Sequence, residues 1–261
     1  MIARAVGGRV HYAWAVVAVT FIVMVSSAGI RSIPGVLILP LEGEFGWSRA
    51  AISAAVSINL VLYGLCGPFA AAVMERVGMR TMMICALSLL GSAVLIATRI
   101  TDVWQLQLLW GVVVGIGAGS MAGWVAASVA NRWFAERRGV VVGILTAANA
   151  TGQLIFLPTV AFLVTMQGWR TAVLAPALVI LAVIPLVWLV IRSFPRDVGL
   201  RPFGAADNGP LIELAPRLVG NPFKRAINVL RSGVRDRDFL LLAGSFFVCG
   251  ASTNGLIGTH L

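Results

Sequence analysis

Charged side chains are scarce in this sequence. Asp, Glu, Lys and Arg make up 11% of its 261 residues, whereas hydrophobic residues make up 59%. A soluble globular domain carries charge at roughly a quarter of its positions. The low charge and a mean hydropathy of +0.94 therefore exclude an ordinary soluble protein. Several runs of about 20 apolar residues, each long enough to cross a hydrocarbon core, predict an all-α polytopic membrane protein.

Cysteine and histidine are also rare. The three Cys residues, Cys66, Cys85 and Cys249, stand inside apolar runs without metal-ligand spacing, so they predict neither a disulfide framework nor a metal site. We expect them to act as small hydrophobic residues. The two His residues, His11 and His260, are far apart, and neither has the Ser or Cys neighbours that would make a nucleophile. The sequence therefore predicts no metal, no cofactor and no enzyme.

Acidic residues are half as common as basic ones, which gives a net charge of +10. The apolar runs predict spans at about 13–38, 48–73, 81–99, 104–130, 139–165, 169–191 and 239–261. With a cytoplasmic N-terminus, sixteen Lys and Arg residues fall in inside segments and three in outside loops. This bias follows the positive-inside rule and predicts an inner (cytoplasmic) membrane protein. The basic residues then indicate contact with anionic lipid headgroups rather than nucleic acid.

The spacing of the spans predicts three regions. Residues 1–191 form a six-helix bundle, because short turns force neighbouring helices to pack antiparallel. Residues 192–238 form a polar cytoplasmic linker, with a short helix around 222–235. Residues 239–261 form a seventh helix, the start of an incomplete C-terminal half. Six spans, a basic linker and a new span are the layout of one half of a two-half transporter.

The sequence MERVGMR, residues 74–80, forms a charged turn between the second and third spans. Gly78 supplies the permissive backbone that a short reversal needs. Arg76 and Arg80 are expected at the level of the inner headgroups. Glu75 is expected to accept backbone N–H bonds or to pair with an Arg. On these residues alone, a turn that merely obeys the positive-inside rule is an equal alternative.

This turn resembles the signature of the major facilitator superfamily, Gly-x-x-x-Asp-Arg-x-Gly-Arg-Arg between helices two and three. The residues that match it in kind are Glu75, Arg76, Gly78 and Arg80. Ala71 replaces the usual Gly, and Met79 replaces one of the basic residues. The resemblance implies that the turn is a charge-mediated cytoplasmic latch, which holds the two halves together in the outward-facing state.

Four further segments are similar to the monocarboxylate-porter and oxalate/formate-antiporter branch of that superfamily. They are FGWSRAAIS (45–53), NRWFAERRGVVVGI (131–144), PRDVGLRPFG (195–204) and STNGLIGTHL (252–261). The resemblance implies a carrier of small organic anions, such as mono- or dicarboxylates, that works by alternating access. A coupling proton and an exchanged anion both remain open. The fourth-helix Arg of proton-coupled drug exporters falls at Gly111 here, which disfavours drug export.

Arg31 is the candidate substrate-binding charge. It stands about 18 residues into the first span, or roughly 27 Å along a helix. Ionisable residues at membrane depth are costly and usually functional, and a guanidinium can hold a carboxylate through two hydrogen bonds. The alternative is that the side chain snorkels to the outer headgroups.

Polar residues at helical spacing are weaker candidates for the substrate path. They are Asn59 with Tyr63, Trp124 with Ser128, Asn149 with Gln153 (Thr146 lies one turn earlier), and Asn254 and His260 in the last span. Each pair could line one cavity, but interhelical hydrogen bonds would place the same residues in the same way. The sequence does not decide between these two roles.

Glycines recur every fourth residue in the fourth span, at Gly111, Gly115, Gly119 and Gly123. This spacing places them along one helical stripe, where another backbone can approach closely. The stripe predicts close helix packing, a smooth face along which a neighbouring helix slides during transport, or both.

The sequence favours a secondary carrier of small organic anions. The alternative is a non-transporting membrane protein, either a truncated half or a subunit that depends on a partner. Transport would then need a homodimer or a separate complementary C-terminal half. A channel is a weaker possibility, because the sequence shows no filter-like loop or ring of charges.

Overall fold

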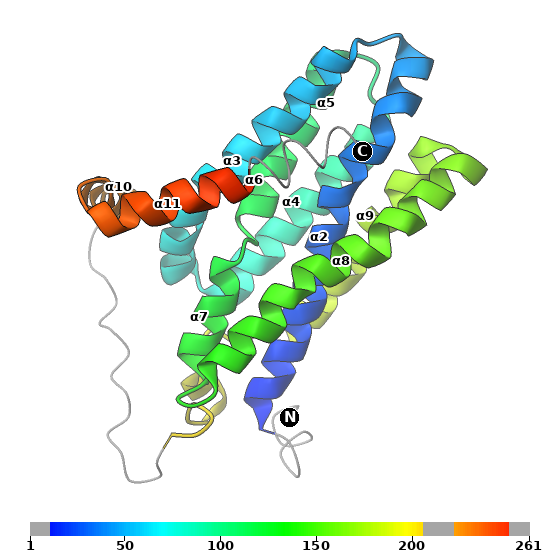
Figure 1. Ribbon diagram of the computed structural model, residues 1–261. Helices are drawn as coiled ribbons and strands as arrows, with labels where there is room; N and C mark the ends of the chain where they lie inside the picture. The colour runs from blue at the N-terminus through cyan, green and yellow to red at the C-terminus, as the bar shows by residue number, and fades with distance from the viewer. Residues whose placement is uncertain (1–10, 206–221, 251–261) are drawn as a thin grey trace. The chain divides into compact units, whose positions relative to one another are not determined.

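The computed structural model describes residues 11–205 and 222–250, and the chain divides into two compact units at residues 217 and 218. Six helical segments of the described chain are long and apolar enough to cross a membrane, as the hydropathy pattern predicts (Figure 1). Five of them are α2 (Tyr12–Phe45), α3 (Arg49–Val77), α4 (Met79–Ala97), α8 (Arg138–Gln167) and α9 (Trp169–Val190). The sixth is Val103–Trp133, which consists of shorter pieces. All six belong to the first unit.

The helices reverse within a few residues because caps and glycines end them abruptly. Ser48 caps α3 by accepting a hydrogen bond from the backbone N–H of Ala51. Three of these turns contain a glycine with positive φ: +66° at Gly46, +85° at Gly78 and +83° at Gly168. A residue with a Cβ atom would be strained at such a φ. Short turns of this kind leave consecutive helices antiparallel and in contact.

The fourth span is interrupted, although the sequence predicts a single apolar run. It comprises α5 (Val103–Leu106), the π-helix η1 (Gln107–Val114), α6 (Gly115–Gly119) and α7 (Trp124–Trp133). The π-helix contains one extra residue per turn, and the glycines that follow it weaken the α-helix further. The chain therefore changes its hydrogen-bonding pattern twice within one membrane crossing.

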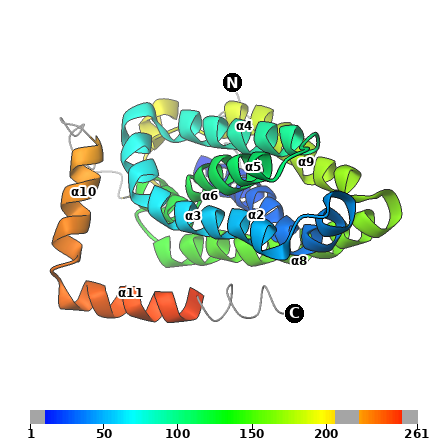
Figure 2. The same ribbon diagram turned by 90° about the horizontal axis from the view of Figure 1, so that it is seen from above.

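The helix α2 is the centre of the six-helix unit. It packs against α8 and α9, while α3 packs against η1 and α6. Figure 2 shows α2 toward the middle of the unit, with α3, α8 and α9 around it. Within the most apolar stretch of each helix, 67% of the residues are buried in α2, but only 17% in α3 and 22% in α8. The helices α3 and α8 therefore present most of their surface to the surroundings.

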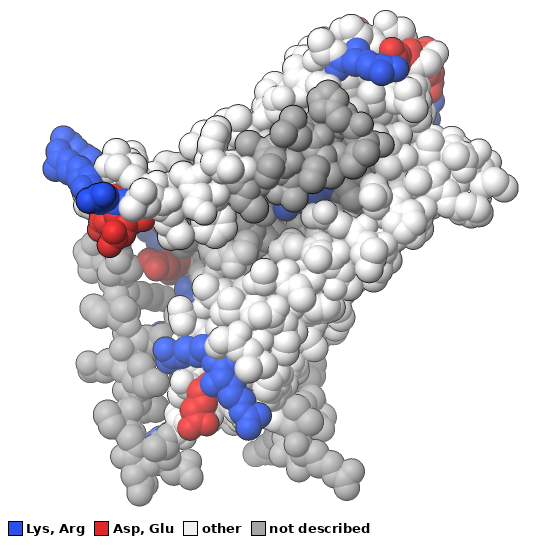
Figure 3. Space-filling view, in the orientation of Figure 1, with Lys and Arg blue, Asp and Glu red and all other residues white. Residues whose placement is uncertain are grey.

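The exposed surface of α3 and α8 is apolar. It includes Val61 and Leu65 on α3, and Leu154, Phe162 and Met166 on α8, all more than half exposed. In the view of Figure 3, charged side chains of this unit gather toward its ends, and the visible surface between them is mostly uncharged. Such a surface suits lipid chains or the helices of another protein.

The second unit contains α10 (Pro222–Gly233) and α11 (Arg237–Gly250). The carboxylate of Asp236 ends the turn between them, because its Oδ1 accepts hydrogen bonds from the N–H groups of Asp238, at 2.9 Å, and Phe239, at 3.4 Å. The helix α11 covers the first part of the predicted seventh span. Asn254 and His260, the two candidates in that span, lie outside the described residues.

Candidate functional site

Arg31 and Tyr63 lie together inside the six-helix unit. The guanidinium carbon of Arg31, on α2, is 4.0 Å from the centre of the Tyr63 ring, on α3. Both side chains are half-buried within segments that can span a membrane. A cation over an aromatic face gains about 0.5 to 2 kcal/mol, more when water is excluded. Two residues selected separately from the sequence thus form one contact between two helices.

Arg31 keeps its charge free of any carboxylate in the described part of the chain. The two salt bridges found there join Glu42 to Arg49 at 2.9 Å and Glu44 to Arg170 at 2.7 Å. The Tyr63 ring contacts the guanidinium as a cation–π partner, whereas an anion would use the N–H donors of the guanidinium. The arrangement is chemically suited to receiving one carboxylate group from outside the chain.

Asn59 connects α3 to the π-helix. Its side-chain Nδ2 donates a 2.7 Å hydrogen bond to the backbone oxygen of Trp110, and the residue is 8% exposed. This is an interhelical hydrogen bond, one of the two roles that the sequence left open for Asn59. The amide thus holds the π-helix at a position one helical turn before Tyr63.

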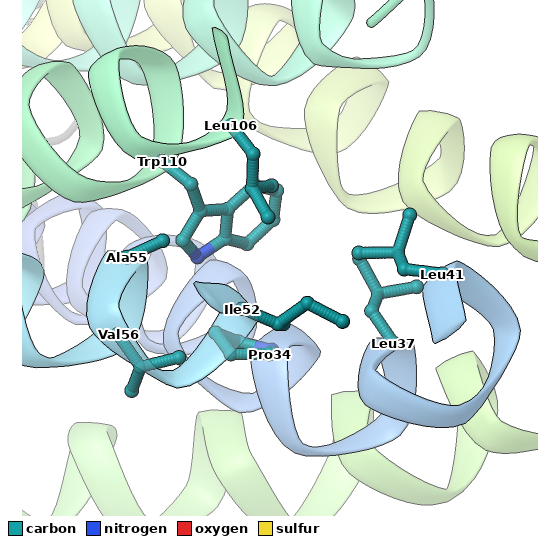
Figure 4. Close-up of a pocket in the computed structure, with 8 residues that line it drawn as sticks. All are labelled: Pro34, Leu37, Leu41, Ile52, Ala55, Val56, Leu106 and Trp110. Carbon is teal, nitrogen blue, oxygen red and sulfur yellow. The ribbon is translucent and has the colours of Figure 1, made fainter. Parts of the chain in front are cut away.

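An apolar pocket lies beside Trp110, the residue that Asn59 contacts. Figure 4 shows its lining, which consists of Pro34, Leu37, Leu41, Ile52, Ala55, Val56, Leu106 and Trp110. These residues come from α2, α3, α5 and η1. None of them carries a charged group or a polar side chain other than the indole N–H of Trp110. The pocket therefore offers no cation to an organic anion.

The remaining polar pairs are more dispersed. The indole N–H of Trp124 donates to the backbone oxygen of Gly119 at 3.2 Å, and Ser128 is half-buried on the same helix α7. On α8, Asn149 is half-buried, whereas Gln153 is exposed, as is Thr146. In the described residues, no hydrogen bond, ion pair or ring contact joins Ser128, Asn149 or Gln153 to Arg31.

Three of the four stripe glycines face α3. A Cβ atom added at Gly111 or Gly115 would lie 3.1 Å from its nearest α3 neighbour, and one at Gly119 would lie 2.8 Å from the backbone oxygen of Tyr63. Nothing lies within 4 Å of the corresponding position at Gly123. The stripe thus allows η1 and α6 to approach the α3 backbone over about two turns. The close approach ends at Gly119, the last residue of α6.

The turn MERVGMR is tied to the end of α9. The N–H of Met79 donates a 3.1 Å hydrogen bond to the hydroxyl oxygen of Ser193, just beyond α9. That hydroxyl would also lie 2.7 Å from a Cβ atom at Gly78. The guanidinium of Arg80 lies 4.9 Å from the ring centre of Trp188 on α9. Met79 and, among the predicted latch residues, Arg80 therefore tie this turn to the end of α9 within the same unit.

Glu75 and Arg76, the other members of the predicted latch, are exposed. The carboxylate of Glu75 interacts favourably with the charge of Arg132, near the end of α7. Arg132 in turn lies 4.8 Å from the ring centre of Phe194, which follows α9. Arg132 and Phe194 were not singled out in the sequence. Arg132 stands in the segment 131–144, which carries the resemblance to the transporter family, and Phe194 directly precedes the segment 195–204.

The first part of the predicted linker is bound to the same end of the bundle. The N–H of Phe203 donates to the oxygen of Trp133 at 2.8 Å, and the N–H of Ala135 donates to the oxygen of Phe203 at 2.8 Å. The Phe203 ring lies 5.5 Å from the ring of His11, which caps α2. Burial lowers the pKa of His11 from its ordinary value of 6.5, and a hydrogen bond with the backbone of Arg201 partly opposes this. Residues 192–205 are thus an integral part of the first unit.

The opposite end of the bundle is held by Glu44, which the sequence analysis also missed. Its carboxylate accepts hydrogen bonds from the Trp169 indole at 2.5 Å and pairs with Arg170 at 2.7 Å. Arg170 also donates to the backbone oxygen of Thr98 at 3.2 Å. The signal for these contacts was a charged and aromatic group at the start of α9, GWR, opposite the end of α2.

Comparison with known proteins agrees with this six-helix architecture. Residues 19–260 match the model of the Major Facilitator Superfamily. The "Uncharacterized MFS-type transporter YcxA" of Bacillus subtilis is 26% identical over 66% of this chain and 42% of its own length. The "Oxalate:formate antiporter" of Oxalobacter formigenes is 28% identical over 62% of this chain and 38% of its own length. Human "Monocarboxylate transporter 14" is 26% identical over 62% of this chain and 32% of its own length.

The chain thus spans less than half the length of these relatives. The family model nevertheless covers nearly all of it, including most of the first membrane-capable segment, the other five, and the turn between α3 and α4. That match shows the family to which these helices belong. The chain is a multi-pass membrane protein of the Major Facilitator Superfamily.

Proposed function

We propose that this chain contributes the N-terminal half of a carrier for small organic anions, with Arg31 as the group that binds the carboxylate. The observation that carries the proposal is the free charge of Arg31 at membrane depth, held by Tyr63 and by no carboxylate among the described residues. The relatives named for oxalate, formate and monocarboxylates support the same class of substrate.

The contact with Tyr63 explains how the charged guanidinium of Arg31 is stabilised at this depth before a substrate binds. A buried Arg paired with Asp or Glu would be neutralised and would have little affinity left for a substrate. An aromatic face offsets part of the desolvation cost without removing the charge. The N–H groups of the guanidinium can then form two parallel hydrogen bonds with a carboxylate. Either a mono- or a dicarboxylate could present such a group.

We further propose transport by alternating access, with the N-terminus in the cytoplasm of a cell whose inner membrane holds the protein. The distribution of basic residues supports this orientation. Glu75, Arg76, Gly78 and Arg80 would then form the cytoplasmic latch. The glycines that face α3 would allow helices to shift at close range. A proton or an exchanged anion would drive the cycle.

The test is uptake of radiolabelled mono- and dicarboxylates into liposomes that contain the purified chain. We expect Arg31→Gln to abolish saturable uptake and Arg31→Lys to retain a small part, because a lysine keeps the charge but not the paired hydrogen bonds. Arg99→Gln is the matched control, since Arg99 is an exposed residue beyond the end of α4. Equal uptake by the Arg31→Gln and Arg99→Gln variants would contradict the proposal.

A second possibility is that the chain does not transport alone. The exposed apolar surfaces of α3 and α8 favour it. A homodimer or a complementary C-terminal half would then cover these surfaces. Well-folded protein that transports only when such a half is co-reconstituted would assign the chain this role, whereas uptake by the chain at a dimeric mass would assign it to a homodimer.

A further inference from the structure

The helix α10 is strongly two-sided. Ile227 and Leu230 of α10 and Val234, in the turn that follows it, recur at intervals of three and four residues. The N–H of Val234 still donates to the oxygen of Leu230 at 2.9 Å, so the three residues share one side. Lys224, three residues before Ile227, and Arg231, four residues after it, flank this apolar side. Ile227 is 53% exposed and Val234 is 60% exposed, whereas Leu230 is half-buried, so this apolar side is only partly covered within the described chain. A 12-residue helix is marginal on its own in water, and its apolar side needs a surface.

The charge of α10 identifies the kind of surface that fits. Residues 222–235 contain four basic residues and no acidic one. An amphipathic helix with basic residues beside an apolar face lies in the interface of a bilayer, where its apolar side enters the acyl boundary and its cations meet lipid phosphates. Each Lys or Arg near an anionic surface adds about 1 kcal/mol, or about fivefold in occupancy.

The position of α10 in the chain brings it to such a surface. Only three residues separate Gly233, the end of α10, from Arg237, the start of α11, so these ends lie at most about 15 Å apart. The exposed residues of α11, including Leu241, Phe246 and Phe247, are predominantly apolar. A helix with this surface belongs in or against a membrane, and it carries α10 with it.

We propose that α10 lies in the surface of an anionic bilayer, with Ile227, Leu230 and Val234 among the upper acyl chains and Lys224 and Arg231 at the phosphates. This anchor fixes the depth at which the following helix α11 enters the membrane. The proposal does not rest on the identity of any transported substrate.

The test uses the whole chain with its three native cysteines replaced by Ser, reconstituted in vesicles. A fluorescent label is attached in turn to Ile227→Cys and to Asn228→Cys, which are neighbours on different sides of α10 and both exposed. The vesicles contain phosphatidylcholine alone or equal parts of phosphatidylcholine and phosphatidylglycerol. In the mixed vesicles, we expect a lipid-borne quencher to act mainly on the label at position 227 and aqueous iodide mainly on the label at position 228.

Charge removal separates the membrane from other partners. Lys224→Gln and Arg231→Gln together should lower the ratio of membrane-bound to unbound α10 in the mixed vesicles by about fivefold per charge removed. Iodide should then quench the label at position 227 more strongly, with little change in vesicles of phosphatidylcholine alone. Equal access of iodide to the two labels would overturn the proposal. It would also be overturned if the label at position 227 were equally shielded in a lipid-free amphipathic polymer, because α10 would then be packing on protein.

Discussion

Replacement of Gly119 by Ala tests whether the glycine stripe sets the distance between the fourth span and α3. The new Cβ atom would lie 2.8 Å from the backbone oxygen of Tyr63, about 0.6 Å inside ordinary van der Waals contact. A backbone atom cannot rotate away, so the helices must separate or tilt. The same clash would move the α3 turn that carries Tyr63, the partner of Arg31.

The expected magnitude follows from two opposing terms. Overpacking in a tight core costs about 1 to 3 kcal/mol. Replacing Gly by Ala inside a helix returns about 0.5 to 1 kcal/mol. The midpoints of these two ranges give a net loss of about 1 kcal/mol for Gly119→Ala, which corresponds to a fall in melting temperature of about 2 to 4 °C for a chain of this size. Intrinsic Trp fluorescence in a heating series would follow it, since the chain contains eight Trp residues.

Gly123 provides a matched control from the same stripe. An added Cβ atom there meets nothing within 4 Å, so Gly123→Ala should leave the melting temperature unchanged or slightly raised. If the two variants melted at the same temperature, the close approach at Gly119 would not contribute to stability. The packing argument for the stripe would then be refuted.

Three further outcomes are expected. Asn59→Leu removes the hydrogen bond to Trp110 and should lower the free energy of unfolding by about 0.6 to 1.7 kcal/mol, measured by denaturation in mixed micelles. Gly78→Ala should destabilise the protein in the same assay, because φ is +85° there and a Cβ atom would meet the Ser193 hydroxyl. The lowered pKa of His11 means that its folded state favours neutral imidazole, so stability should be complete above pH 6.5 and should fall as pH drops toward the folded-state pKa. His11→Asn keeps a cap for α2 and should flatten this dependence in melts from pH 5 to 8; a slope unchanged from wild type would count against His11 as its source.

The sequence predicts the membrane-crossing elements well because hydropathy and span length determine them. Six predicted spans match six membrane-capable segments, although α2 continues to Phe45, beyond the predicted end near residue 38. Pro40 in that extension and Pro34 just before it are tolerated inside a packed helix. The apolar run gives way to Glu42 and Glu44, but a helix can continue into the headgroup region after its apolar run ends.

The contacts between helices were much harder to predict. The spacing of Arg31 and Tyr63 along the chain does not indicate that α2 and α3 bring them within 4.0 Å of each other. The π-helix changes the faces of the fourth span, and the hydropathy of its residues resembles that of an α-helix. Asn59 could be identified as polar and membrane-deep. Its acceptor is the backbone oxygen of Trp110, and every residue has such an oxygen, so the sequence does not indicate the partner.

The interhelical polar contacts also suggest which parts of the unit move together. Glu44 ties α2 to α9 at one end, and the hydroxyl of Ser193 ties the α3–α4 turn to the end of α9 at the other. Contacts at both ends of the six-helix unit oppose bending within it. A large movement therefore costs the least free energy at surfaces that form no such polar contacts. The exposed apolar faces of α3 and α8 are surfaces of that kind. Arg31 contacts a residue of α3, so motion of a partner along α3 would change the surroundings of its charge while the unit itself stays nearly rigid.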